Sequence, residues 1–173
     1  VSPGGKLPVT FPERLTDGPV TKPEQYPGKN GAVVYSEGLF VGYRHYDNAR
    51  KAVAYPFGHG LTYTQFAYTR LRVSHTVAGT KVTLNIRNIG DVSATDTPQV
   101  YVTRPQRAPV LLPVRWRAGY TKVTLAKGES RDVTITLPPT NWRYYDDTSH
   151  RWKRLPGNPV VEVGQSSRIL LLR

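Results

Sequence analysis

The strongest constraint on the fold is a strict alternation of apolar and polar residues in the second half of the chain. Val82, Leu84 and Ile86 occupy every second position, with polar side chains between them, and residues 132–137 repeat the pattern. A period of two places the apolar side chains on one face of an extended backbone, which is typical of a half-buried strand. The sequence therefore predicts β-strands that pack one face against a core.

Further apolar segments extend this prediction along the chain. Strands are expected around residues 100–102, 123–125, 161–163 and 169–171. Turn residues predict two hairpins, one joining 123–125 to 133–137 through Lys127-Gly128-Glu129 and one joining 142–145 to 151–155 through 146–150. About seven short strands without a helix over residues 64–173 indicate a β-sandwich of the immunoglobulin or fibronectin type.

The first 63 residues follow a different pattern. Ten of the first 30 residues are proline or glycine, a density that interrupts helices and central strands. It leaves room for one short strand, around residues 7–11, and residues 31–63 show no convincing 3.6-residue period. This segment cannot form a core alone, so we expect a division into residues 1–63 and 64–173. Because the chain starts on Val1, we also expect it to be a processed or cut portion of a larger protein.

The strand before Val161 carries an unusual proline. Pro159 has no backbone N–H to donate to a ladder, so this strand is expected at a sheet edge or with a late start.

Several kinds of site are missing from the sequence. The chain has no cysteine, and its four histidines have no partner at metal-ligand spacing, so neither a metal nor a cofactor is expected. A glycoside hydrolase needs two carboxyl groups across the scissile bond. Asp146 and Asp147 are adjacent, but they lie in an expected turn, where solvation is the simpler interpretation. The sequence therefore predicts no catalytic residue in this chain.

The net charge of +12 is concentrated in the second part of the chain. Residues 1–63 carry 7 basic and 5 acidic residues, and residues 64–173 carry 17 and 7, which are balances of +2 and +10. An excess of this kind can attract polyanions. No nucleic-acid motif accompanies it, so a solvated basic surface is favoured and no nucleic acid is expected. The longest aliphatic run, residues 169–172, is too short to span a membrane.

Three motifs follow one another in the first 66 residues. Residues 5–12 read GKLPVTFP, residues 35–47 read YSEGLFVGYRHYD, and residues 56–66 read PFGHGLTYTQF. Each resembles a segment of the family 3 glycoside hydrolases, and the three occur in the same order. Shorter matches follow at residues 88–91, 99–102, 125–130 and 163–167. The resemblance covers nearly all 173 residues.

The resemblance implies an architecture. Residues 1–63 correspond to the terminal strand and loops of an α/β sandwich domain, and residues 64–173 to a fibronectin type III-like domain. It also implies that both catalytic carboxylates lie on a larger upstream polypeptide that carries a barrel and the α/β sandwich. The expected activity is retaining hydrolysis of terminal β-D-glucosyl residues, with β-xylosides, glucans and glycosylated metabolites left open. A secreted or periplasmic location is favoured over the cytoplasm.

A few side chains are candidates for contact with a substrate. Phe57 and His59 lie in the Gly-rich linker, where packing is favoured over sugar binding. Glu37, Tyr43, Arg44 and Asp47 share one motif, and a buried arginine–carboxylate pairing between domains is favoured for them.

Aromatic residues suggest a second class of function. Trp142, Tyr144, Tyr145 and Trp152 could form a sugar-stacking platform, although a role in the core or at an interface is favoured. The alternative function is thus a non-catalytic module that binds carbohydrate or a polyanion, with Arg115 and Arg117 as basic contacts. A structural subunit that accompanies a larger chain is a third interpretation.

Overall fold

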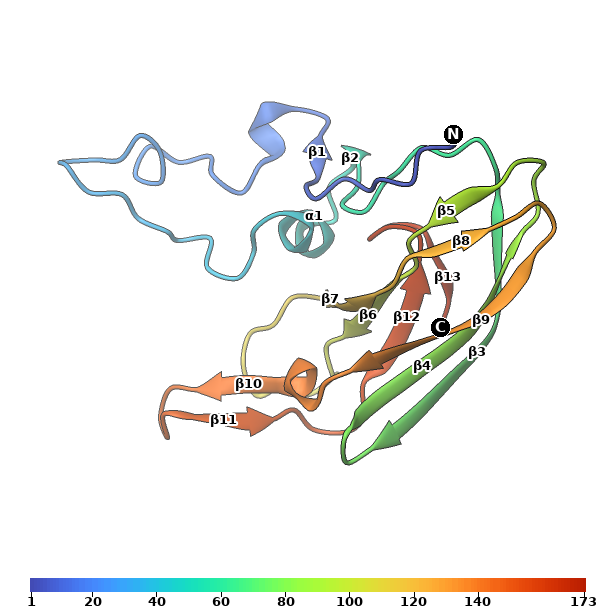
Figure 1. Cartoon of the computed structure of the whole chain (residues 1–173). Coiled ribbons are helices and arrows are strands. Elements are labelled where there is room, and N and C mark those ends of the chain that lie inside the picture. The colour runs from blue at the N-terminus through green and yellow to red at the C-terminus, as the bar shows by residue number, and fades with distance from the viewer.

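The computed structural model describes residues 1–173 and shows a twisted β-sandwich with an irregular N-terminal segment laid across one end (Figure 1). One sheet has the strand order β13-β12-β6-β7 and the other has the order β3-β4-β9. A short pair, β5-β8, lies beside them. The strands of the sandwich are β3 (Phe66–Thr76), β4 (Gly79–Asn88), β5 (Ala94–Asp96), β6 (Gln99–Thr103), β7 (Arg115–Tyr120), β8 (Val123–Leu125), β9 (Ser130–Leu137), β12 (Val160–Gly164) and β13 (Leu170–Leu172).

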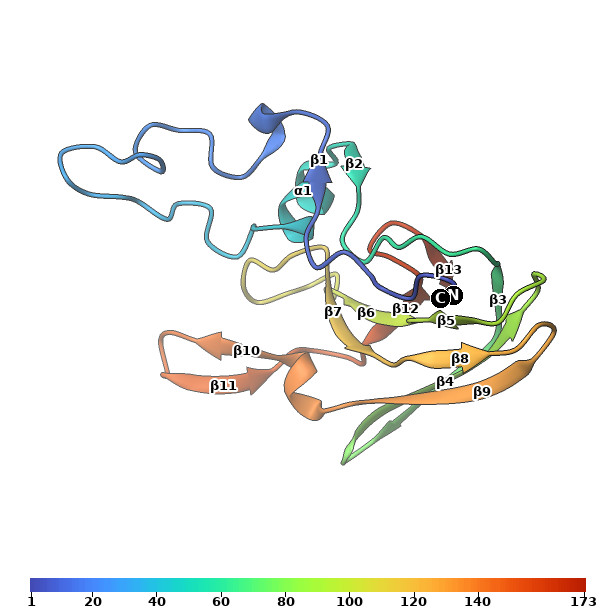
Figure 2. The same ribbon diagram turned by 45° about the horizontal axis from the view of Figure 1, so that its top comes forward.

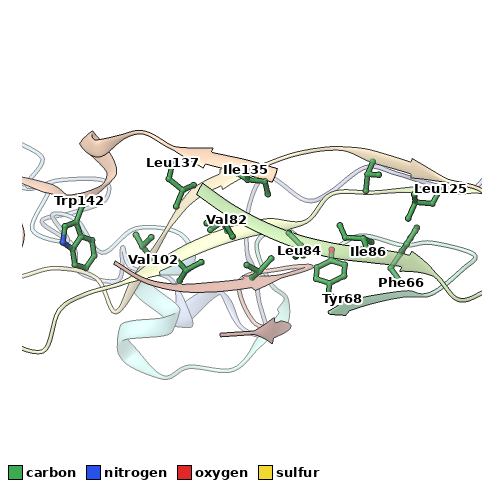
Figure 3. Packing of buried hydrophobic residues seen from close by; sticks show 14 of the residues in the cluster. Phe66, Tyr68, Val82, Leu84, Ile86, Val102, Leu125, Ile135, Leu137 and Trp142 are labelled. Atoms are coloured by element: carbon green, nitrogen blue, oxygen red, sulfur yellow. The ribbon is translucent and has the colours of Figure 1, made fainter. Parts of the chain in front are cut away.

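The core lies between the two sheets and consists of 16 buried residues (Figure 3). Val82, Leu84 and Ile86 of β4 are fully buried, as the alternation predicts. Fully burying such a side chain contributes roughly 1.5–3 kcal/mol. Val100 and Val102 of β6 are also fully buried. The predicted β-sandwich is therefore confirmed.

The outer face of the three-stranded sheet is polar. β4 is the central strand and pairs with β3 and β9 in antiparallel register. Thr83 and Thr134 hydroxyls lie 3.0 Å apart across this face, and the Asn85 side chain donates to Asp132 at 2.6 Å. Cross-strand pairs of this kind stabilise register.

One predicted hairpin is confirmed and the other is wrong. β10 (Arg143–Asp146) and β11 (Arg151–Arg154) form a two-stranded sheet that projects from the sandwich (Figure 1). By contrast, β8 pairs with β5 and β9 pairs with β4, so residues 123–125 and 133–137 are not partners. Their turn does form, but Gly128 donates its backbone N–H to Asn88 at 3.1 Å and Asn88 donates to Glu129 at 2.9 Å. These bonds hold the turn where the chain passes from the β5-β8 pair to the β3-β4-β9 sheet.

The N-terminal segment holds a helix that the sequence pattern did not indicate. It contains β1 (Phe11–Pro12), paired with β2 (Val53–Tyr55), the 3₁₀ turn η1 (Leu15–Asp17) and helix α1 (Tyr43–Ala49). A second 3₁₀ turn, η2 (Pro139–Trp142), precedes β10. Only Tyr46 of α1 is buried, and a seven-residue helix with one buried side chain leaves no readable period.

The short strand expected around residues 7–11 is displaced. The regular strand is limited to β1, but Leu7 donates to the His59 carbonyl at 2.7 Å and accepts from the Gly58 N–H at 2.8 Å. The N-terminal segment is thus joined by backbone hydrogen bonds to the linker. Residues 18–42 form a long excursion that extends away from the sandwich in both views (Figures 1 and 2).

β12 begins at Val160, directly after Pro159. The late start is therefore confirmed, and the edge position is wrong because β12 lies between β13 and β6.

The structure contains no helix of the length and apolarity that a membrane crossing requires.

Candidate functional site

The candidate site is the junction where α1 and the linker meet the four-stranded sheet. Asp47 of α1 lies 2.8 Å from the Arg168 Nε atom, and Arg168 also donates to the Lys51 carbonyl at 3.0 Å. Beside them, Arg115 Nε lies 3.3 Å from Glu162 Oε2. The junction therefore holds two carboxylates and two guanidinium groups. The expected arginine–carboxylate pairing is present, with Arg168 rather than Arg44 as the partner of Asp47.

Burial dominates the electrostatics of Asp47. Its side chain is only 6% exposed. Desolvation raises the pKa of Asp47 above its ordinary value, although the nearby Arg168 and Arg115 lower it; Glu162 raises it further. The two guanidinium groups that face this buried carboxylate offset part of the cost of its desolvation. This arrangement fixes α1 against the sandwich.

Aromatic packing reinforces the same junction. The Tyr43 ring lies 4.9 Å from that of Phe57 and 6.0 Å from that of Tyr101. The Tyr43 hydroxyl accepts the backbone N–H of Arg117 at 2.8 Å. Tyr101 is fully buried, and its hydroxyl donates to Gln99 at 2.6 Å. Burial raises the pKa of Tyr101, so it remains a neutral donor.

Gln99 ties the linker to the sandwich. Its side-chain amide donates to the Gln165 carbonyl at 2.9 Å and to the Gly58 carbonyl at 3.3 Å. Gly58 has a φ of +82°, which side chains rarely adopt, and a Cβ there would overlap the Gln99 amide. Only glycine satisfies both conditions. The linker motif thus serves close packing.

Phe57 and His59, the two candidates for substrate contact, lie in this packing. Phe57 is half-buried beside Tyr43, and its carbonyl accepts the Ser167 N–H at 2.9 Å. The His59 ring lies 5.1 Å from that of Tyr55 and lines a cavity of about 490 Å³. Their substrate role stays a prediction.

The four aromatic residues considered as a platform do not form one surface. Trp142 is 4% exposed and belongs to the core, where it stacks on Trp116 at 5.9 Å. Tyr145 and Trp152 are 44% and 65% exposed and pair edge to face at 5.7 Å. Together with Tyr144 they line a groove of about 570 Å³ beside the β10–β11 hairpin.

The remaining candidates have structural partners. Glu37 accepts a hydrogen bond from Gln25 at 3.2 Å, and the Arg44 guanidinium carbon lies 6.0 Å from the centroid of the Tyr43 ring. Asp146 accepts hydrogen bonds from Lys153 and Ser149, which lower its pKa to about 2. No three His, Asp or Glu side chains come together in a way that could hold a metal ion.

Many large apolar side chains of residues 1–63 are exposed. Leu15 is 92% exposed, Tyr35 is 81% exposed and Tyr26 is 77% exposed. Large exposed apolar patches indicate interaction surfaces. The other large apolar residues exposed in the first 63 positions are Val1, Val9, Phe11, Val20, Val33, Val34, Leu39, Val41, Tyr55, Leu61 and Tyr63.

Two residues of the junction escape prediction from the sequence. Arg168 meets α1 although it is 117 residues from its partner Lys51. In the sequence, Glu162 is a polar residue of a predicted strand, and no basic residue close to it in sequence indicates an ion pair. No spacing rule connects residues so far apart, so only the folded structure reveals this network.

The comparisons with known proteins agree with this architecture. A family model of the fibronectin type III-like domain matches residues 96–167. A β-glucosidase of Streptomyces venezuelae, solved with D-glucose, superposes with a TM-score of 0.94 at 35% identity over 98% of the chain and 22% of that protein. A family 3 β-glucosidase of Bifidobacterium adolescentis gives 0.92 at 42% identity over 99% of the chain and 25% of its own. Nearly the whole chain thus matches a portion of family 3 β-glucosidases.

Curated relatives support the same family and differ in the sugars that they are named for. Probable β-glucosidase K of Emericella nidulans is 39% identical over 99% of the chain, and an exo-α-(1→6)-L-arabinopyranosidase of Bifidobacterium breve is 43% identical over 97%. The chain spans 20% and 22% of these two proteins. The chain thus spans about a fifth of the length of these relatives.

Proposed function

We propose that the chain is the C-terminal portion of a retaining β-glucosidase-type enzyme that hydrolyses terminal β-D-glucosyl residues. In this proposal the catalytic carboxylates lie on a larger upstream polypeptide, which carries a barrel and an α/β sandwich, and this chain braces those domains. The observation that carries the proposal is the match of 99% of the chain to 20% of a β-glucosidase.

The exposed apolar surface of residues 1–63 supports the bracing role. Side chains such as Leu15 and Tyr35 are almost fully exposed, whereas the sandwich beneath has a closed core. An apolar surface of this extent is covered in a stable protein. The upstream domains are the occupant that the family likeness favours.

The proposed division of labour follows the fold. Residues 1–63 complete the upstream α/β sandwich, and residues 64–173 form the fibronectin type III-like domain. The junction of Asp47 with Arg168 and of Tyr43 with Tyr101 makes the two parts move together. The sandwich therefore fixes the position of the segment that contacts the catalytic domains.

Substitutions on the apolar surface test the bracing role. We expect Leu15→Ser and Tyr35→Ser each to weaken association with the upstream polypeptide about ten- to hundredfold, since each removes roughly 1.5–3 kcal/mol of apolar burial. The Tm of the chain alone should stay within about 1 °C, because neither side chain is buried there. Association is measured by calorimetry or surface plasmon resonance.

Val77→Ser is the matched control, since Val77 is also fully exposed but lies on the β3–β4 turn. It should leave the association unchanged. Equal affinities for all three variants would show that the apolar surface is not the interface.

The binding-module alternative has less support. Arg115, one of its two basic contacts, is paired with Glu162 and donates to the Ser167 carbonyl at 3.3 Å. Trp142, one of its four aromatic residues, is in the core. The groove beside Tyr145 and Trp152 is the feature that favours it.

A further inference from the structure

A second cavity lies beside Phe57, between the N-terminal segment and the four-stranded sheet. Its volume is about 430 Å³. Three basic side chains line it, Lys6, Arg117 and Lys122, and no Asp or Glu does. Cavities lined by one sign of charge concentrate ions of the opposite sign.

Arg117 is held in place without using its hydrogen-bond donors. Its guanidinium carbon lies 5.7 Å from the centroid of the Phe57 ring and 4.8 Å from that of Tyr120. The guanidinium group makes no ion pair and no hydrogen bond within the chain. Stacking on two rings restricts the rotamers of a long side chain, so a ligand meets a preorganised fork of N–H donors at a lower entropic cost.

Thr97 has a buried hydroxyl beside the same cavity. It is 6% exposed, and its hydroxyl has no hydrogen-bond partner in the chain. A buried hydroxyl without a partner costs free energy. Thr97 lines the cavity, so rotation of its side chain toward a bound acceptor would give that hydroxyl a partner.

The neighbouring acid leaves the cavity positive. Lys6 lies 3.4 Å from Asp96, which is 2% exposed. Asp96 also accepts hydrogen bonds from the Tyr68 hydroxyl at 2.6 Å and from the Thr97 N–H at 2.8 Å. One acid against three bases leaves a balance of +2, and neither Arg117 nor Lys122 has an acidic partner.

We propose that this cavity binds a small oxyanion, meaning a phosphate, sulfate or carboxylate group. Arg117 supplies paired N–H donors, Lys6 and Lys122 supply charge, and Thr97 donates its hydroxyl. Charge-assisted bonds to a guanidinium are the strong class of hydrogen bond. The cavity is larger than an inorganic ion needs, so it also accommodates an organic group attached to the anion.

Calorimetry on the chain, together with any polypeptide that co-purifies with it, tests the proposal. The titrants are inorganic phosphate, sulfate, glucose 6-phosphate and glucose at pH 7 and low ionic strength. We expect the three anions to bind with Kd values of about 1 mM or below, a free energy near −4 kcal/mol. Any heat from glucose should be the same for the parent and for Arg117→Gln, because a glucosidase active site on the accompanying polypeptide could bind glucose without this cavity. Tighter binding of glucose 6-phosphate than of phosphate identifies an anionic organic ligand, and equal binding identifies the free ion.

Three variants give the test its specificity. Arg117→Gln should weaken phosphate binding about tenfold, as expected for loss of a charge-assisted pair. Thr97→Val should weaken it several-fold while leaving the Tm of the ligand-free protein unchanged or higher, since it removes an unpaired buried hydroxyl. Arg151→Gln, at an exposed position of β11 with no ion pair, is the control and should bind as the parent does.

Two results would overturn the proposal. One is the absence of binding heat from all three anions at about 10 mM, ten times the expected Kd. The other is equal phosphate affinity for Arg117→Gln and Arg151→Gln. The thermal measurement on Thr97→Val separates loss of the site from loss of the fold.

Discussion

Replacing Gly58 with alanine should destabilise the chain by about 2–4 kcal/mol. Adoption of a positive φ by alanine costs about 1 kcal/mol, and overpacking at a buried contact costs about 1–3 kcal/mol more. The added Cβ would overlap the side-chain amide of Gln99. Gln99 cannot move away without losing its bonds to Tyr101 and Gln165. Urea denaturation followed by tryptophan fluorescence measures the loss.

Gly128→Ala is the control that separates strain from overpacking. Gly128 also has a positive φ, of +73°, but a Cβ added there would have no atom within 4 Å. The free energy of unfolding of Gly128→Ala should fall only by the cost of the positive φ, which is about 1 kcal/mol. Equal losses for the two variants would show that the Gln99 contact does not constrain the linker.

Replacing Arg168 with leucine should cost about 2–3 kcal/mol at pH 7. The change leaves the Asp47 carboxylate, 6% exposed, without its nearest cation. Breaking a fully buried pair costs about 3–5 kcal/mol. The lower figure applies because 35% of the Arg168 side chain is exposed. Arg151→Leu on the exposed face of β11 is the matched control and should change stability by less than about 0.5 kcal/mol.

The same pair gives a pH dependence with a defined sign. The pKa of Asp47 is already raised above 3.8 by burial, so its contribution to stability is present below pH 3.8 and decreases as the pH rises through the higher folded-state pKa. Removing Arg168 removes a cause that lowers this pKa. The gap in stability between the parent and Arg168→Leu should therefore be smaller at about pH 4 than at about pH 7. A gap independent of pH would contradict the assignment of the effect to Asp47.

The alternation of apolar and polar residues predicts the β-sandwich correctly, but the sequence does not predict correctly which strands pair. The alternation through Val82, Leu84 and Ile86 identifies the strand and its buried face, because strand periodicity is a property of adjacent residues. The false hairpin between β8 and β9 arose from the turn at Gly128. A turn fixes the local direction of the chain, whereas the choice of partner strand depends on hydrogen bonds to distant Asn88.

The junction shows the same division between local and distant information. The motif around Tyr43 and Asp47 could be associated with arginine–carboxylate pairing from its residues alone. The identity of the partner, Arg168, could not, since it comes from the far end of the chain. The helix containing both motif residues was missed because only Tyr46 contributes to a buried face.

In the proposed function, this chain braces an active site that other domains hold. Hydrolysis of 4-nitrophenyl β-D-glucoside tests this proposal, measured for the purified chain alone and for the chain in complex with the upstream domains. We expect no hydrolysis above the buffer rate by the chain alone and ready hydrolysis by the complex. Hydrolysis by the chain alone, at a rate that scales with its concentration, would show that the active site lies in this chain instead.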